Sequence, residues 1–199
     1  MKTIDLMKAI NRTGRRIFSA VDIAKMVGSN NKNTIYKTVE RLTRNGILTR
    51  ITNGVYSAVT TPPDLFEIAN SLYVPSYVSL ESALYRYGVI SQAPYTITSV
   101  STNKSKRKTA FNNEFEYTHL NSKYFFGYVR DRHVLIASRE KALLDLLYLV
   151  SKNSRSFNFE GIDWKAINRK EFKAYMRNYS FLPLLNLIKR MGLWSKEKQ

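Results

Sequence analysis

A tight β-hairpin directly after a basic helix is the feature that most constrains this fold. Residues 40–59 read ERLTRNGILTRITNGVYSAV, in which a helix-like run ends at Asn45-Gly46 and two short β-like runs follow. Asn53-Gly54 joins these runs and supplies the positive φ angles of a two-residue turn. The sequence therefore predicts a hairpin with its tip at Asn53-Gly54.

Three helices are predicted ahead of the hairpin. The run TIDLMKAI has apolar residues at near-helical spacing. The run SAVDIAKMVG begins at Ser19, a suitable N-cap, and ends at Gly28; its apolar residues gather on one side: Val21, Ile23, Ala24 and Val27. A third helix, capped by Asn33, follows the polar turn SNNKN and ends at Gly46. This order of helices and hairpin predicts a winged helix-turn-helix over residues 1–60.

The third helix has an apolar face and a basic face. At 100° per residue, three apolar side chains fall on one stripe: Ile35, Val39 and Leu42. Polar and basic side chains lie roughly opposite: Thr34, Lys37, Arg41 and Arg44. This arrangement suits a helix that enters the major groove of DNA, although a solvated helix face has the same pattern.

The hairpin is expected to close the core behind this helix with Ile47, Ile51 and Tyr56. Neighbouring residues of a strand point to opposite faces, so Arg50 is expected to point away from Ile51 and toward DNA.

The predicted DNA contacts come from the third helix and the hairpin. They are Asn33, Thr34, Lys37, Arg41, Arg44, Arg50, Thr52 and Asn53. Candidates for additional phosphate contacts lie elsewhere: Arg15, Arg16, Lys104, Lys106, Arg107 and Lys108. The last four belong to a basic turn, NKSKRKT, which a solvated loop explains equally well.

Composition favours a polyanionic partner. The 199-residue chain has a formal net charge of +17 and 44% hydrophobic residues, so it can bury a core while attracting DNA, RNA or an anionic membrane surface. The chain has no cysteine, which excludes a disulfide framework and fits a reducing cytosol. The run ALLDLLYLV is far too short to span a membrane, and the N-terminus lacks a signal-peptide pattern. We therefore expect a cytoplasmic protein that binds no membrane.

A proline-containing break, TTPPDL, separates the first module from a second predicted domain at 65–199. Helices are predicted over DLFEIANSL, SLESALYRYG, SREKALLDLLYLV and the basic C-terminal part, with Ser79 and Ser138 as caps. Strands are predicted over YTITSVST, EFEYTHL, KYFFGYV and the second half of RDRHVLIAS. The leucine pattern places Asp145 on the solvent side of its helix. The predicted fold class is α+β: a winged helix-turn-helix followed by a mixed α+β domain with C-terminal helices.

Sequence motifs for catalysis are missing. His119 and His133 do not form a helical metal pair, and Glu114 and Glu116 fit an exposed strand face as well as a pair of catalytic carboxylates. None of the eight glycines belongs to a dinucleotide-binding motif or a P-loop, and there is no Gly-x-Ser-x-Gly elbow. We therefore expect no enzymatic activity, no cofactor and no metal.

Three segments carry a resemblance to a known family: YVSLESALYRYGVISQAPYTITSVST, EFEYTHLNSKYFFG and LIASREKALLDLLYL. Together they resemble the AbiEi antitoxin family of type IV toxin–antitoxin systems, and FSAVDIAKMVG to GILTRITNGVY resembles the winged helix of that family. The resemblance covers most of residues 15–150, and IASREKALLDLLY is its most specific stretch. Arg139 stands where the family favours proline or a small residue.

The resemblance implies a winged helix joined to an α+β antitoxin domain. It also implies a transcriptional repressor that binds inverted repeats of double-stranded DNA in the promoter of its own operon. The family counteracts a nucleotidyltransferase toxin encoded beside it, in abortive infection, without a stable complex with that toxin.

Two other readings remain open from the residues. In a nucleic-acid-acting enzyme, several carboxylates of the second domain would meet around a metal: Glu114, Glu116, Asp131, Glu140 and Asp145. In a ligand-sensing winged-helix regulator, the second domain would contain a sizeable apolar pocket.

Overall fold

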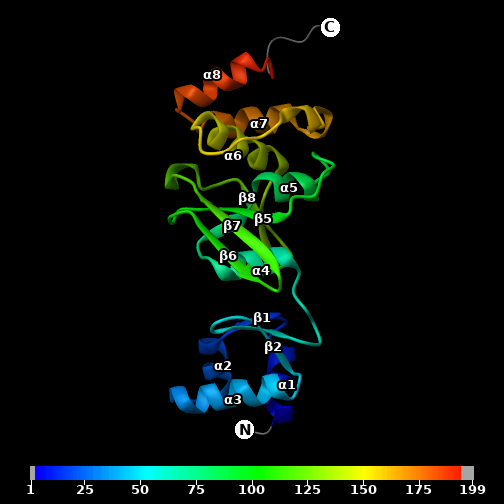
Figure 1. Cartoon of the computed structure of the whole chain (residues 1–199), viewed down its shortest axis with the longest axis vertical. Helices are drawn as coiled ribbons and strands as arrows, with labels where there is room; N and C mark the ends of the chain where they lie inside the picture. The colour runs from blue at the N-terminus through cyan, green and yellow to red at the C-terminus, as the bar shows by residue number, and fades with distance from the viewer. Residues whose placement is uncertain (1–2, 194–199) are drawn as a thin grey trace.

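The computed structural model describes residues 3–193, and over these residues the fold is mixed α+β with eight α-helices and two β-sheets (Figure 1). The predicted α+β class is confirmed. The N-terminal part, residues 3–58, contains six elements: α1 (Thr3–Arg12), β1 (Ile17–Ser19), α2 (Ala20–Val27), α3 (Lys32–Arg44), β2 (Leu48–Thr52) and β3 (Val55–Ala58). This part lies at one end of an elongated molecule, and the last helices lie at the other end.

Short-range hydrogen bonds set the ends of α2 and α3. Ser19 and Asp22 form a capping box, in which the side chain of each accepts a hydrogen bond from the backbone N–H of the other. The cap of α3 is Asn31, whose side chain accepts hydrogen bonds from the N–H groups of Asn33 and Thr34. The prediction of Asn33 as the cap is wrong, because Asn33 already lies in the first turn and its own N–H needs a partner.

The core of the N-terminal part lies between its helices and an antiparallel sheet of order β1-β3-β2. Its buried members come from all six elements: Leu6, Ile10, Phe18, Ile23, Val39, Leu42, Leu48 and Ala58. The stripe predicted on the third helix therefore does face this core. Val21 does not join it, contrary to the predicted apolar side of α2, and its side chain is 62% exposed.

β2 and β3 form the predicted hairpin, with Asn53-Gly54 between the paired residues Thr52 and Val55. Gly54 takes a φ of 73°, and it alone of the turn pair has a positive φ, so the expectation of two such angles is wrong. The strand register shifts between Arg50 and Thr52, which makes Ile51 a β-bulge residue.

Ile51, at the bulge, packs into a different core from the one predicted. Its side chain is buried, but it belongs to the core of the following part of the chain and not to the core behind α3. Ile47 and Tyr56 do pack against the core behind α3, as expected. The hairpin therefore has apolar side chains on both of its faces.

The C-terminal part, residues 65–193, contains a six-stranded mixed sheet. Its helices are α4 (Leu65–Leu72), α5 (Leu80–Arg86), α6 (Arg139–Ser151), α7 (Arg169–Met176) and α8 (Leu182–Arg190), with short 3-10 turns at Ser122–Tyr124, Phe159–Gly161 and Trp164–Ala166. Its strands are β4 (Ser76–Val78), β5 (Thr96–Ser101), β6 (Lys106–Ala110), β7 (Asn113–His119), β8 (Tyr128–Asp131) and β9 (Val134–Ala137).

The sheet order is β6-β7-β5-β4-β9-β8. Helix α4 covers the face toward the N-terminal part, and α5 to α8 lie beyond the opposite face (Figure 1). The predicted turn NKSKRKT is mostly strand β6, and the predicted strand KYFFGYV divides into a 3-10 turn and the start of β8. None of the helices found within residues 3–193 is long and apolar enough to cross a membrane.

Helix α6 is buried on nearly every side, since it lies between the sheet and helices α7 and α8. Asp145 has no exposed surface, so its predicted place on the solvent side is wrong. The ammonium group of Lys141, one turn earlier and equally buried, pairs with this carboxylate. Asp145 also accepts hydrogen bonds from the hydroxyl groups of Tyr77 (3.0 Å), Ser79 (2.8 Å) and Tyr179 (3.2 Å).

The two parts of the chain share an apolar and an ionic junction. Ile17, Ile51 and Val55 of the N-terminal sheet pack with the core of the C-terminal part. The guanidinium of Arg16 lies 3.4 Å from the carboxylate of Glu67, a residue that is only 6% exposed. Contacts other than the connecting segment therefore hold the two parts together.

Candidate nucleic-acid interface

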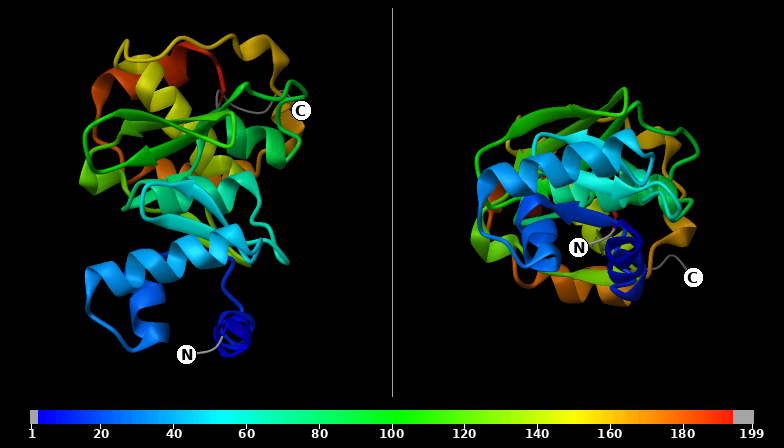
Figure 2. Two further views of the ribbon diagram at one scale, coloured as in Figure 1. Left: turned by 60° about the horizontal axis from the view of Figure 1, so that its bottom comes forward. Right: turned by 90° about the horizontal axis from the view of Figure 1, so that it is seen from below.

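Helix α3 presents its basic face to solvent at the end of the molecule. Figure 2 shows α3 running across that end, with its outer side uncovered. All five residues predicted to contact DNA from this helix are exposed: Asn33, Thr34, Lys37, Arg41 and Arg44. Arg44 already has a partner, because its guanidinium lies 2.9 Å from the carboxylate of Glu40 one turn earlier. Of the three cations on this face, Lys37 and Arg41 are therefore the two without a nearby carboxylate partner among the described residues.

The hairpin places a further cation beside this helix. Arg50 is exposed and pairs across the hairpin with Tyr56, while the adjacent Ile51 is buried, as expected for neighbours on a strand. Asn53 is exposed at the tip, and Thr52 is half-buried. The structure therefore brings two of the predicted hairpin residues, Arg50 and Asn53, next to α2 and α3.

A groove of about 620 Å³ lies between α2, α3 and the hairpin. We call it the α2–α3–hairpin groove, and its twelve lining residues are Ala20, Val21, Ala24, Asn30, Lys32, Ile35, Tyr36, Val39, Arg50, Asn53, Gly54 and Tyr56. Tyr36 is 71% exposed at its edge. Lys32, Tyr36 and Val21 were not among the predicted site residues. The sequence did contain a signal for Tyr36, because this tyrosine stands between Ile35 of the apolar stripe and Lys37 of the basic face.

Arg15 and Arg16 lie away from this groove, in clefts between the two parts of the chain. A cleft of about 250 Å³ and another of about 410 Å³ share both arginines and His133. Arg15 donates hydrogen bonds to the carboxylate of Asp22 (2.8 Å and 3.4 Å), and Arg16 faces Glu67. Burial raises the pKa of Glu67, and Arg16 opposes that shift. Both arginines thus already have carboxylate partners.

The four basic residues predicted around 104–108 lie on or beside β6, an edge of the second sheet, apart from α3 (Figure 1). The ammonium group of Lys108 is bonded to the backbone carbonyl of Leu72, and burial together with nearby Lys106 lowers the pKa of Lys108. Arg107 lies 3.8 Å from Glu116. Lys104 and Lys106 remain exposed. The structure does not bring this group together with the helix and hairpin residues.

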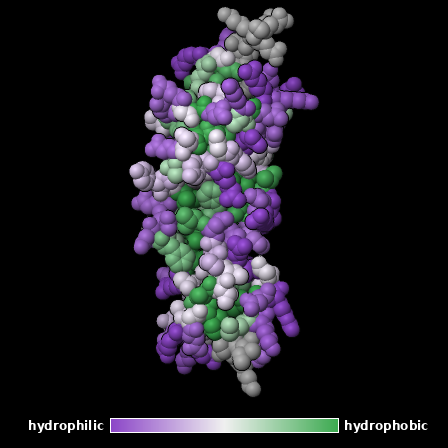
Figure 3. Space-filling model, turned by 90° about the vertical axis from the view of Figure 1, so that its right-hand side faces the viewer, coloured by the Kyte–Doolittle hydropathy of each residue, from purple (hydrophilic) through white to green (hydrophobic). Residues whose placement is uncertain are grey.

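Hydrophilic side chains dominate the side of the molecule shown in Figure 3, and smaller apolar areas lie between them, including one on the N-terminal part. Residues 1–60 contain eleven Lys and Arg against three Asp and Glu. The N-terminal part is therefore strongly basic, and it also has apolar side chains on its surface.

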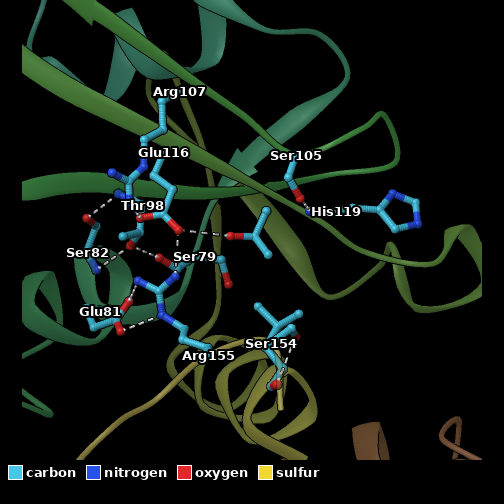
Figure 4. A network of polar contacts seen from close by, with 12 residues as sticks. Ser79, Glu81, Ser82, Thr98, Ser105, Arg107, Glu116, His119, Ser154 and Arg155 are labelled. Carbon is cyan, nitrogen blue, oxygen red and sulfur yellow. Dashed lines mark hydrogen bonds and ion pairs between the residues drawn. The ribbon is translucent and has the colours of Figure 1, made fainter. Parts of the chain in front are cut away.

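Four of the five carboxylates named for an enzymatic site lie in separate ion pairs: Glu116, Asp131, Glu140 and Asp145. Figure 4 shows Arg155 bound to Glu81 through two hydrogen bonds (2.7 Å and 2.8 Å) and to Glu116 through one (3.0 Å). Elsewhere, Asp131 pairs with Arg86, and Glu140 accepts a hydrogen bond from the N–H of Asn168. Within residues 3–193, no group of three or more His, Asp or Glu side chains could hold a metal ion.

The C-terminal part has a smaller cavity, of about 320 Å³, beside the Arg155 network. Ile90, Pro94, Tyr95 and Phe157 contribute to its lining, with Glu81 at one side. This cavity is half the volume of the α2–α3–hairpin groove, so the larger concave surface of the two adjoins the basic helix.

Comparisons with known proteins bear on the fold. No family model matches the chain, and no curated protein matches it. Among solved structures, the chain is similar to the RV2827C protein from Mycobacterium tuberculosis, with a TM-score of 0.51 and 14% sequence identity over 94% of this chain and 70% of that chain. At this identity, the similarity indicates that the two chains share an overall fold.

Proposed function

We propose that this protein is a DNA-binding transcriptional repressor whose N-terminal part is a winged helix-turn-helix. The observation that carries the proposal is the exposed pair Lys37 and Arg41 on α3, with Arg50 on the adjacent hairpin. In this arrangement α3 enters the major groove, and the hairpin contacts the neighbouring phosphate backbone. The high positive charge of residues 1–60 supports a polyanionic partner.

Phosphate contacts supply most of the affinity in this mechanism. Each Lys or Arg that neutralises a phosphate releases condensed counterions, so the affinity falls steeply with salt concentration. Asn33 and Thr34, at the start of α3, have side chains that can bond to base edges. The basic residues position the protein on DNA, and the polar residues at the helix start discriminate between sequences.

The salt dependence of binding tests this proposal. Fluorescence anisotropy would compare the wild type with Lys37→Ala/Arg41→Ala on a duplex from the promoter region upstream of the gene. We expect the slope of log affinity against log salt to fall in magnitude by about 1.8. The matched control is Lys189→Ala/Arg190→Ala, which removes the same charge from exposed residues of α8 at the far end. Equal losses in both variants would reject α3 as the DNA-binding helix.

We further propose that the protein is an antitoxin of the AbiEi type, acting in the cytoplasm. The support is the resemblance of residues 77–150 to that family, and the implied partner is a nucleotidyltransferase toxin encoded beside it. The full-length Lys37→Ala/Arg41→Ala variant separates the two roles when it is expressed from an unrelated promoter together with that toxin. Restored growth would show that neutralisation does not require DNA binding by α3, whereas loss of protection with normal protein levels would link neutralisation to DNA binding.

A further inference from the structure

We infer that the α2–α3–hairpin groove reads thymine methyl groups in the major groove of DNA, with Tyr36 and Val21 as specificity-determining residues. This inference rests on the proposed DNA binding and names the chemical feature of the operator that the site would recognise.

The exposure of these two side chains has no explanation in the packing of the protein. Tyr36 is 71% exposed and Val21 is 62% exposed, whereas other apolar residues of the same helices, such as Ile23, Val39 and Leu42, are at most 6% exposed. An exposed tyrosine and valine at the edges of one groove form a surface that an apolar group can cover.

The charges around the groove favour DNA as the occupant. Lys32 and Arg50 stand among the lining residues, Asn30 and Asn53 add amide groups, and none of the twelve described lining residues is acidic. Lys32 lies one turn before Tyr36 on α3, so this cation and the exposed tyrosine line the same side of the groove. A polyanion that also presents apolar groups matches this combination better than an apolar peptide does.

Thymine provides such an apolar group. Its C5-methyl is the one apolar group that the major-groove edges of the four bases present, and apolar side chains contact it. On α3, Tyr36 lies about 100° around the helix from Lys37, so its ring can face base edges while the lysine reaches the backbone.

The opposite wall of the groove is held in place by the hairpin. The N–H of Ala20, at the start of α2, donates a hydrogen bond of 2.9 Å to the carbonyl of Gly54 at the hairpin tip. Val21 follows Ala20, so its position is fixed relative to both α2 and the hairpin. Such a pre-formed surface can discriminate between bases without first being ordered.

The test uses the full-length protein and duplexes selected from a randomised pool by their binding to the wild type. Each thymine of the selected sequence is then replaced by uracil, which lacks only the methyl group. We expect a loss of about fourfold in affinity at each thymine whose methyl is buried in the groove, the equivalent of one buried methylene-sized group. Tyr36→Phe should keep this sensitivity, whereas Tyr36→Ala and Val21→Ala should each lose it at one or more positions. Tyr95→Ala is the control, since Tyr95 is 99% exposed and lies in the C-terminal part.

The outcomes separate this inference from the proposed function. Selection of a sequence whose binding is insensitive to uracil would overturn the inference and leave DNA binding intact. Unchanged uracil sensitivity in both alanine variants would also overturn it, by placing the methyl contact elsewhere. Failure of the wild type to enrich any sequence would overturn the DNA-binding proposal and the inference together. Because the uracil experiment on the wild type requires no variant, folding defects cannot obscure it.

Discussion

Removing the positive charge of Lys141 should destabilise the fold more than any surface substitution. Lys141 and Asp145 have no exposed surface, and the ammonium group also lies 3.0 Å from the hydroxyl of Tyr77 and 3.2 Å from that of Tyr179. Burial lowers the pKa of Lys141, and the ion pair with Asp145 opposes that shift. Each of the two buried charges is therefore stabilised mainly by the opposite charge of its partner.

The expected magnitude follows from this burial. Lys141→Met leaves the Asp145 carboxylate in the core with only hydroxyl donors, and breaking a buried ion pair in this way costs about 3–5 kcal/mol. For a chain of this length, each kcal/mol lowers the melting temperature by about 2–4 °C, so the midpoint should fall by about 6–20 °C. Asp145→Asn should cost a similar amount, because it leaves the ammonium group unpaired.

Urea denaturation followed by circular dichroism would measure both single variants and the double variant Lys141→Met/Asp145→Asn. The double variant removes both charges and keeps an amide that the three hydroxyl groups can still bond. Its loss should therefore be smaller than the sum of the single losses by about 1–3 kcal/mol. Additive losses, or single losses below about 1 kcal/mol, would show that the buried pair does not carry this share of the stability.

Three other outcomes are expected. Arg50→Ala should weaken binding to operator and scrambled duplexes by a similar factor in anisotropy, because a phosphate contact carries no sequence information; a loss confined to the operator would assign Arg50 to base reading. Gly54→Val should lower the unfolding free energy by about 1–2 kcal/mol in urea denaturation through backbone strain alone, since φ is 73° and no atom lies within 4 Å of an added Cβ. The pKa of Asp22 is lowered in the folded protein: burial alone would raise this pKa, but the hydrogen bonds from Ser19 and the ion pair with Arg15 outweigh burial. The stability that Asp22 contributes should be fully present above the pKa of an unfolded aspartate, about 3.9, and should be lost as the pH falls through the lower pKa of the folded state. The melting temperatures of the wild type and of Asp22→Asn should therefore converge in acid.

Elements with local signals could be predicted from the sequence. Ser19, Gly28 and Gly54 mark the ends of α2 and the hairpin turn through their own backbone preferences, and the structure has these boundaries. Strands β1 and β4 were missed because each has three residues, too few to show alternation. Their positions depend on pairing with strands distant in sequence, which a local pattern does not contain.

The burial of Asp145 shows the limit of helical periodicity. An apolar stripe identifies one buried side of a helix, but α6 is covered on the opposite side too, by helices that come later in the chain. A lysine four residues before an aspartate within an apolar run was the signal for a buried pair. The basic face of α3 could be predicted, because it follows from the spacing of residues along one helix. The groove could not, because it forms only when the hairpin tip is hydrogen-bonded to the start of α2.

Strand β2 belongs to two cores at once, since Leu48 packs in the N-terminal core and Ile51 in the core of the C-terminal part. The connecting segment therefore does not act as a hinge, and lengthening it would not release α3 to reorient. If two copies bind an inverted repeat, as the proposed function implies, the angle and separation of their α3 helices follow from how the copies meet. The tolerated spacing between operator half-sites should then be narrow, within a base pair or so of one helical turn or its multiples.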